Sequence, residues 1–148
     1  MKVRKAAISD LEPLTELFEQ YRIWYGQKPN LEGSTSFIKE RMEQNESVVF
    51  VVENEETVLL GFTQLYPIFS STRIQRLWLL NDLFVSSDAR GKGLSKLLIN
   101  AAKDHCRETE GCAIILETQK SNDIGNNLYP SSGFELNKDH NFYEWHCE

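Results

Sequence analysis

Residues 83–98 carry the combination of side chains in this sequence that is best suited to bind a ligand. An apolar run ends at Val85, a turn with one arginine and two glycines follows, and a helical pattern then begins. Backbone N–H groups at the start of a helix bind anions, and glycines let the backbone approach a ligand closely. Basic residues in and after the turn add positive charge: Arg90, Lys92 and Lys96. The pattern therefore predicts a pyrophosphate site.

The common phosphate motifs do not describe this turn. A Walker A loop requires G-x-x-x-x-G-K-[ST], but Gly93 is followed by Leu94 and Ser95. A dinucleotide fingerprint requires a third glycine where this chain has Lys96. The alternative to a ligand site is an ordinary helix start with solvated lysines, and the order of strand, turn and helix favours the site.

Two polar residues interrupt the apolar strand pattern that precedes the turn. Side chains of a strand alternate between its two faces, so Asn81 and Asp82 lie on opposite faces, each alone in an apolar row. A buried polar group needs a partner. This pair is therefore the second chemical feature of the sequence.

Helices and strands alternate along the whole sequence and must position these residues. We expect strands at residues 3–7, 48–52, 58–66, 74–85 and 113–118, at Phe134 and at 142–145. We expect helices from Ser9 onward and over residues 35–44, 91–107 and 122–129, with a loop over 67–73. This order predicts an α/β (α+β) fold, a single domain over residues 1–148 whose mixed, mainly antiparallel central sheet is flanked by helices.

Local patterns refine three of these elements. Ser9-Asp10-Leu11-Glu12 has the form of a capping box and is expected to open the first helix. Gly61, inside a strand pattern, indicates a bulge. The exposed side of the first helix carries three acidic residues: Glu12, Glu16 and Glu19. The helix after the glycine turn has an expected buried stripe: Leu94, Leu97, Leu98, Ala101 and His105.

The composition excludes several classes of partner. The 148 residues are 41% hydrophobic, which suits one domain with a single core. A formal net charge of −6 disfavours non-specific binding to nucleic acid or to an anionic membrane and favours a cationic substrate. No apolar run follows the charged N-terminus, and the longest stretch free of charged residues, 57–72, is too polar and short to span a bilayer. We therefore expect neither a nucleic-acid nor a membrane partner.

The three cysteines, Cys106, Cys112 and Cys147, form no C-x-x-C pair and are odd in number. This usage suits a reducing compartment, so a cytoplasmic location is predicted. Histidines stand beside two of these cysteines, but their spacing matches no zinc pattern, and no metal site is predicted.

The segment Arg90-Gly91-Lys92-Gly93-Leu94-Ser95 resembles the R/Q-x-x-G-x-G/A acetyl-CoA signature of the GNAT N-acetyltransferases. The order of elements is similar to that family over nearly the whole chain. A second, separate similarity is the ending at residues 122–129, with an asparagine seven residues before a tyrosine, followed by Gly133-Phe134. One departure is Ser95, which stands where the signature has Gly or Ala.

This resemblance implies acetyl-CoA as cosubstrate and assigns residues to it. The family opens a splay between two parallel strands through a bulge in the first, here the strands ending at Val85 and Thr118. The pantetheine arm then pairs with backbone groups around Leu83, Phe84 and Val85. The resemblance assigns seven further residues to the pyrophosphate: Arg90, Gly91, Lys92, Gly93, Leu94, Ser95 and Lys96. It places Asn122 against the cofactor and Tyr129 facing the thiol, where a phenol can protonate the departing thiolate.

The resemblance is closest to the subgroup with an Asn-Asp-Leu-Phe/Tyr-Val strand, whose members acetylate polyamines and histone tails. Asn81 can orient a water or bond the amine but cannot take its proton. Asp82 is therefore the better anchor or base, with a purely structural role left open and Glu117 as a weaker candidate. Trp24 and Tyr25, together with residues 66–69, are aromatic groups at places that the family uses to cover substrate; core packing is the alternative.

The predicted function is acetyl transfer from acetyl-CoA to a primary amine, with a polyamine-like small molecule favoured. We expect direct attack in a ternary complex, because no cysteine lies near the predicted acetyl position. Two alternatives stay open: acetylation of protein lysines or N-termini, and a non-catalytic acyl-CoA sensor, which Asn81 supports. A homodimer is usual in this family, and its interface could be built by Phe142, Tyr143 and Trp145, which would otherwise close the core.

Overall fold

The computed structural model describes residues 1–147, which form two compact units that meet between residues 117 and 118 along the chain. The first unit contains a five-stranded sheet of β1 (Lys2–Lys5), β2 (Val48–Glu53), β3 (Leu59–Ser70), β4 (Gln75–Val85) and β5 (Ile114–Ile115). Its helices are α1 (Leu11–Trp24), α2 (Leu31–Glu43) and α3 (Leu94–Glu108). The second unit contains α4 (Asp123–Ser131). The prediction of one domain over the whole chain stays a prediction.

The strands lie in the sheet in sequence order, β1-β2-β3-β4-β5. Neighbours are antiparallel except β4 and β5, which are parallel and are connected through α3. This topology confirms the predicted mixed, mainly antiparallel sheet.

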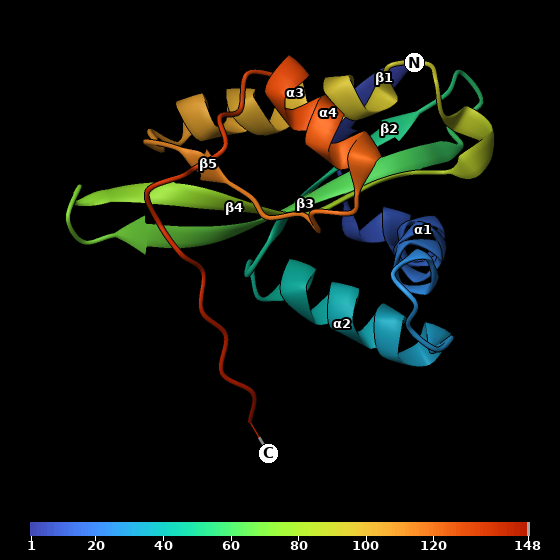
Figure 1. Cartoon of the computed structure of the whole chain (residues 1–148). Helices are drawn as coiled ribbons and strands as arrows, with labels where there is room; N and C mark the ends of the chain where they lie inside the picture. Colours follow the sequence, from blue (N-terminus) through green and yellow to red (C-terminus); the bar gives the residue numbers. More distant parts are fainter. Residues whose placement is uncertain (148) are drawn as a thin grey trace. The chain divides into compact units, whose positions relative to one another are not determined.

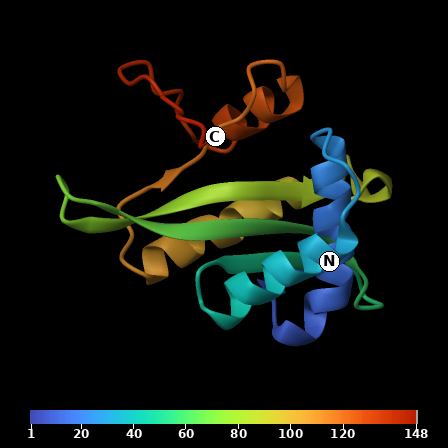
Figure 2. The ribbon, with the colours of Figure 1, turned by 90° about the horizontal axis from the view of Figure 1, so that it is seen from below.

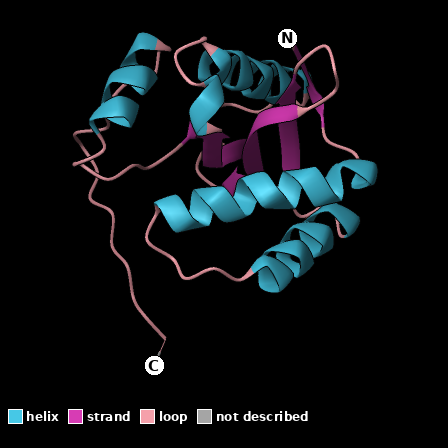
Figure 3. Cartoon of the chain, turned by 90° about the vertical axis from the view of Figure 1, so that its right-hand side faces the viewer, coloured by secondary structure: helices cyan, strands magenta, loops and turns pink. Residues whose placement is uncertain are grey.

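Helices cover both faces of this sheet (Figures 1 and 3). Helices α1 and α2 lie on one face, where Figure 2 shows them in front of the strands, and α3 lies on the other. The core on the α1 and α2 face is large and partly aromatic; it comprises Leu14, Leu17, Phe18, Ile38, Val49, Val51, Leu59, Phe62 and Phe84. The core under α3 comprises Val52, Val85, Ala89, Leu94 and Leu98. The alternation of strand side chains thus supplies both cores.

A bulge interrupts β4 at its most polar point. Gln64 of β3 lies opposite Asp82, and Leu65 lies opposite Leu80, so Asn81 is the extra residue on β4. The pairing of β4 with β5 covers only two positions and stops at Leu79. The remainder of β4 therefore runs on without β5 beside it, as the predicted splay requires.

The bulge predicted at Gly61 is also present in the sheet. Val52 lies opposite Gly61, and Glu53 lies opposite Leu59, which leaves Leu60 as the extra residue. A Cβ on Gly61 would lie 2.6 Å from the carbonyl oxygen of Phe84, so glycine is needed for the close approach of β3 and β4.

The predicted capping box at Ser9 is wrong. Residues Ile8–Asp10 form a 3₁₀ turn, and the Asp10 carboxylate accepts the N–H of Ala7 at 2.8 Å. Arg4 holds that carboxylate in place at 2.7 Å. The α-helix therefore begins only at Leu11.

Two other helices also begin elsewhere than predicted. Helix α2 begins at Leu31 because the Asn30 side chain accepts the N–H of Gly33 at 3.0 Å as its N-cap. Helix α3 begins at Leu94, since Gly93 has a left-handed conformation that ends the turn. Its buried stripe is rotated from the prediction, with Leu97 40% exposed; the buried residues are Leu94, Leu98, Ile99, Ala102 and Cys106.

The expected loop over 67–73 is largely strand, because β3 extends to Ser70 and Pro67 lies opposite Trp78. Pro67 fits there because the register of β2 ends at Leu65, so the proline lies on an edge. The strands expected at Phe134 and at 142–145 are not formed: no strand follows β5 in residues 116–147. Among the described residues, no helix has the length and apolar character needed to cross a membrane.

Candidate active site

The glycine turn between β4 and α3 has the geometry of an anion site. Gly91 and Gly93 both have φ of 76°, in the left-handed region that glycine adopts without strain. A Cβ added at either position would meet no atom within 4 Å, so the surface of the turn is open. Glycine is therefore favoured at these two positions by the positive φ angle and not by a lack of space for a Cβ.

The backbone donors of this turn point to a ligand. Within the described part of the chain, the N–H groups of residues 91–95 have no hydrogen-bond acceptor, and the first helical bonds are donated by Lys96 and Leu97 to the carbonyl of Gly93. Arg90 is held against the end of β4, where its Nε donates to the Val85 carbonyl at 3.1 Å. Five consecutive free donors at the positive end of a helix dipole suit a pyrophosphate.

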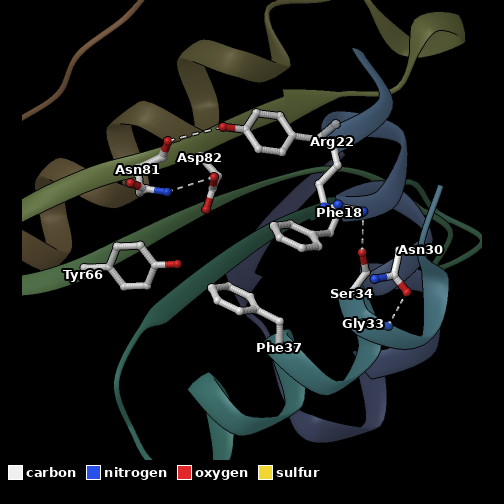
Figure 4. A pocket seen from close by; sticks show the side chains of 10 residues that line it. Phe18, Arg22, Asn30, Gly33, Ser34, Phe37, Tyr66, Asn81 and Asp82 are labelled. Carbon is white, nitrogen blue, oxygen red and sulfur yellow. Dashed lines mark hydrogen bonds between the residues drawn. The ribbon is translucent and has the colours of Figure 1, made fainter. Parts of the chain in front are cut away.

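A cavity of about 360 Å³ lies beside the bulge, between β3 and β4 on one side and α1 and α2 on the other (Figure 4). Its lining is aromatic and polar: Phe18, Tyr21, Arg22, Asn30, Gly33, Ser34, Phe37, Tyr66, Asn81 and Asp82. The volume is in the range of small-molecule sites.

Asp82 is the buried acid of this cavity, with only 4% of its surface exposed. Its Oδ2 accepts from Gln64 Nε2 at 2.7 Å, and its Oδ1 accepts from Asn81 Nδ2 at 3.0 Å. Burial raises the pKa of Asp82, while hydrogen bonds from Gln64, Tyr21 and Asn81 act in the opposite direction. The carboxylate is thus held in place and is a better proton acceptor than an exposed aspartate.

The bulge gives Asn81 and Asp82 different surroundings. Asn81 is exposed, and its carbonyl accepts from the Tyr21 hydroxyl at 3.5 Å. Both residues line the same cavity, although simple strand alternation predicted opposite faces. The extra residue in β4 is what brings the two together.

Tyr66 extends from β3 into the cavity, where its hydroxyl lies among the other lining residues (Figure 4). Burial and the negative charge of Asp82 raise the pKa of this phenol, so it stays protonated and can donate a hydrogen bond. Residues 66–69 were predicted to be near the substrate, and Tyr66 is the one of them that lines the cavity.

Glu19 of α1 is hydrogen-bonded to the start of α2, at residues that line this cavity. Its carboxylate accepts from the backbone N–H of Asn30, from the Ser34 hydroxyl at 2.5 Å and from Arg22 Nη1 at 2.8 Å. The bond from Ser34 is the largest of the contributions that lower its pKa. Glu19 is only 8% exposed, so its expected place on an acidic solvent surface is wrong. Two of its three donors, Asn30 and Ser34, are brought to Glu19 by the packing of α2 against α1. The spacing of charged residues along α1 does not show this packing.

Residues 11–134 match the sequence model of the Acetyltransferase (GNAT) family. The chain belongs to the GNAT acetyltransferases. It is therefore an enzyme, and it uses acetyl-CoA, the acetyl donor of this family.

Several known proteins are similar to this GNAT acetyltransferase over at least nine tenths of their length. A Bacillus subtilis (strain 168) protein named Uncharacterized N-acetyltransferase YhfO is 42% identical over 135 residues, 91% of this chain and 90% of that protein. A Probable acetyltransferase of Haemophilus influenzae (strain ATCC 51907 / DSM 11121 / KW20 / Rd) is 35% identical over 144 residues, 97% of each chain. The crystal structure of a probable acetyltransferase superposes with a TM-score of 0.95 at 34% identity, over 100% of this chain and 99% of that one.

The structure of AAC(6')-Iy, in complex with the bisubstrate analog CoA-S-monomethyl-acetylneamine, has the same fold. It superposes with a TM-score of 0.80 at 21% identity and covers 99% of this chain and 98% of that one. These comparisons confirm the predicted fold class and enzyme class.

The two aromatic residues predicted to cover the substrate of this GNAT enzyme lie at the end of α1. Trp24 is 49% exposed and does not line the cavity, and its ring contacts Tyr25 edge to face at 4.7 Å. Tyr25 in turn contacts Tyr21, which does line the cavity, at 4.9 Å. Their role in binding stays a prediction.

Asn122 and Tyr129 belong to the second unit. Asn122 is the N-cap of α4, where its Oδ1 accepts from Gly125 N at 3.1 Å and its Nδ2 donates to Thr118 Oγ1 at 2.9 Å. Tyr129 contacts Phe134 edge to face at 5.9 Å. Asn122 thus has a structural function within its own unit, and the predicted roles of both residues toward acetyl-CoA stay predictions.

Proposed function

We propose that this GNAT acetyltransferase moves the acetyl group of acetyl-CoA to a primary amine of a small molecule. The observation that carries this proposal is the carboxylate of Asp82, buried and fixed by hydrogen bonds at the wall of an aromatic cavity beside the β4 bulge. Such a group can hold an ammonium ion and can accept its proton. An acyl-CoA sensor has no need of either property.

Acetyl-CoA is proposed to bind along the free part of β4 and over the glycine turn. The pantetheine amides would pair with backbone groups of Leu83, Phe84 and Val85, because β5 does not extend beside them. The pyrophosphate would accept from the free N–H groups of residues 91–95, with charge supplied by Lys92 and Lys96. Arg90 would instead hold the turn against β4, since its Nε is bonded to Val85.

The amine is proposed to enter the cavity as an ammonium and to lose a proton to Asp82, directly or through a water oriented by Asn81. The amine lone pair then attacks the thioester carbonyl carbon, the nitrogen of the tetrahedral adduct loses a second proton to solvent, and the adduct breaks its C–S bond. Tyr129 is proposed to protonate the departing thiolate and to regain its proton from solvent. The products are the acetamide, CoA as its thiol and one released proton.

Direct attack in a ternary complex is favoured because none of the described residues that line the cavity is a cysteine. Cys106 is buried on α3, where its Sγ donates to the Gly111 carbonyl at 3.5 Å, and burial raises the pKa of its thiol. Cys112 lies just before β5. Neither is placed as an acyl carrier.

On the sequence alone, the net charge of −6 and the acid at residue 82 favour a cationic acceptor such as a polyamine. The cavity volume of about 360 Å³, with a lining contributed by four elements, favours a small molecule over a protein lysine or N-terminus. An amine panel tests these choices: release of CoA thiol is followed with spermidine, spermine, amino acids, aminoglycosides and a histone-tail peptide. Binding of acetyl-CoA without amine-dependent thiol release would favour the sensor instead.

We also propose a homodimer in the cytoplasm. Phe142, Tyr143 and Trp145 are 76%, 85% and 84% exposed, an amount of aromatic surface typical of an interface. The cysteines are unpaired, which suits a reducing compartment. Sedimentation of the full chain against a variant with these three aromatics changed to serine tests the dimer, since a dimer held by them should dissociate.

A further inference from the structure

The end of the cavity opposite Asp82 is formed by α1 and α2 and presents unused hydrogen-bond donors (Figure 4). Arg22 donates through Nη1 to Glu19 at 2.8 Å and to Ser34 at 3.4 Å. Over residues 1–147, no hydrogen bond involves its Nε or Nη2. Asn30 accepts from Gly33 through Oδ1, and its Nδ2 donates to none of the described residues.

The acceptors at this end, in contrast, are already engaged. Glu19 accepts three hydrogen bonds, one of them from the buried Ser34 hydroxyl. The Glu19 carboxylate also balances the charge of Arg22, so a second ammonium would meet a guanidinium without a free carboxylate beside it. This end therefore suits an anion or another strong acceptor and disfavours the far end of a diamine.

The wall between the two ends is aromatic. The rings of Phe18 and Phe37 are stacked with centroids 5.8 Å apart and an angle of 2° between their planes. In Figure 4 the Phe18 ring lies between Asp82 on the sheet side and Arg22 on the helix side, and the Phe37 ring lies below it, on α2. A substrate that reaches both ends must pass an apolar section.

We propose, on the basis of the function proposed above, that the acceptor is an amino carboxylate: its amine lies at Asp82, and Arg22 binds its carboxylate. The Nε and Nη2 edge of a guanidinium offers two parallel donors that match the two oxygens of a carboxylate. Asn30 Nδ2 supplies a third donor. Arg22 is thus a specificity residue, and the carboxylate is unchanged by the reaction, which acetylates only the amine.

The test compares four acceptors that share one apolar spacer: 6-aminohexanoate, 6-aminohexanamide, hexylamine and 1,6-diaminohexane. A series of ω-amino carboxylates of shorter and longer spacer is included so that length does not hide the preference. We expect the best carboxylate to exceed its own amide and the diamine by about tenfold or more in kcat/KM. Higher kcat/KM for the diamine, or equal values for all four, would overturn the proposal.

Variants then assign the preference to Arg22. Arg22→Gln leaves Glu19 without its cation, so the double variant Glu19→Gln with Arg22→Gln is measured as well. In both, the ratio of carboxylate to amide kcat/KM should fall by about tenfold or more, whereas mere damage to the fold would lower both rates alike. Asp104→Asn with Arg107→Gln is the matched control, since it removes an exposed pair of the same spacing on α3 and should keep the ratio.

An unchanged ratio in the Arg22 variants would overturn the inference and leave the proposed function standing. Absence of thiol release with every amine, in wild-type protein that binds acetyl-CoA, would overturn the proposed function itself. The two failures are therefore distinguishable.

Discussion

The glycine turn and the cavity beside the β4 bulge are built in different ways. The turn is one stretch of chain, residues 90–95, and its binding groups are backbone N–H groups. The cavity takes its lining from α1, α2, β3 and β4, and its binding groups are side chains. The proposed site for acetyl-CoA thus depends on local backbone conformation, whereas the proposed site for the amine substrate depends on packing between elements.

This difference has consequences for substitution. A backbone site tolerates changes of side chain wherever the conformation is kept, and it fails when the left-handed glycines are replaced. A side-chain site fails when one group in a network is removed, because the remaining polar groups are left unpaired. Changes in the two regions should therefore alter different constants.

The largest expected effect lies outside both regions, at Tyr129, and separates catalysis from binding. Tyr129→Phe removes the proposed acid but keeps the ring, so kcat should fall by about 10–100-fold while acetyl-CoA affinity stays within a few-fold. Steady-state kinetics and a direct titration of acetyl-CoA measure the two. Tyr143→Phe, at an exposed tyrosine, is the matched control, because it keeps the aromatic ring on which the proposed role of Tyr143 in the dimer rests. Full activity of Tyr129→Phe would leave the thiolate to be protonated by solvent.

The next effect tests the turn. Gly93→Asp forces a side chain into a left-handed conformation and puts a negative charge where phosphate is expected, so acetyl-CoA affinity should fall by about tenfold or more. Gly26→Asp is the control, because Gly26 has φ of 81° and no atom within 4 Å of an added Cβ. It should show similar strain with unchanged affinity. Equal affinities for the two folded variants would remove the turn from the cofactor site.

The corresponding change in the cavity is Asp82→Asn. We expect the KM for the amine to rise about tenfold, ~1.4 kcal/mol, with little change in the KM for acetyl-CoA. The variant should fold, since the buried Oε1 of Gln64 has no partner among the described residues and can accept from the new amide if the Gln64 amide turns over. Unchanged constants would assign Asp82 to the fold alone.

Asp82 also predicts a pH dependence for the cavity that the turn should lack. Because burial raises the pKa of Asp82, the carboxylate becomes neutral at a higher pH than an ordinary aspartate. The KM for the amine should therefore rise as the pH falls through this raised value, and Asp82→Asn should abolish that change. In unfolding experiments, the stability of the wild type relative to Asp82→Asn should decrease as the pH rises from below the ordinary aspartate value of 3.8.

Of these substitutions, Glu19→Gln is expected to change the rate of acetyl transfer least, because Glu19 stabilises the contact between α1 and α2. Glu19→Gln should reduce the free energy of unfolding by ~1–3 kcal/mol, because donors of Arg22, Ser34 and Asn30 lose a charged acceptor. Since the pKa of Glu19 is lowered in the fold, this stabilisation should be present above the pKa of an unfolded glutamate and lost as the pH falls through the folded value. Denaturant titrations of both proteins at several pH values check this; identical midpoints throughout would contradict it.

The glycine turn and the cavity also differ in how much of each the sequence predicts. The turn is recognisable because its strand, glycines, cations and helix are contiguous. Asp82 is recognisable because residues 77–85 of its strand are apolar apart from it and Asn81. Arg22, Asn30 and Ser34 were missed because on α1 and α2 they resemble ordinary solvated residues. Their importance depends on how two helices pack, which no local spacing records.

The C-terminal segment shows the same limit for strands. Residues 142–145 have the aromatic composition of a strand, but a strand exists only with a partner to pair with. Within the described residues, that segment forms no strand. The aromatic composition indicates that the segment favours a strand, but it does not indicate a strand with which the segment would pair.

The central claim is that the turn and the cavity are filled at the same time and that the acetyl group moves directly from one to the other. Initial rates of CoA thiol release, measured over a grid of acetyl-CoA and amine concentrations, test this most directly. We predict double-reciprocal lines that intersect, with one acetylated amine formed for each thiol released. Parallel lines, which indicate an acyl-enzyme, or thiol release independent of the amine would contradict the account.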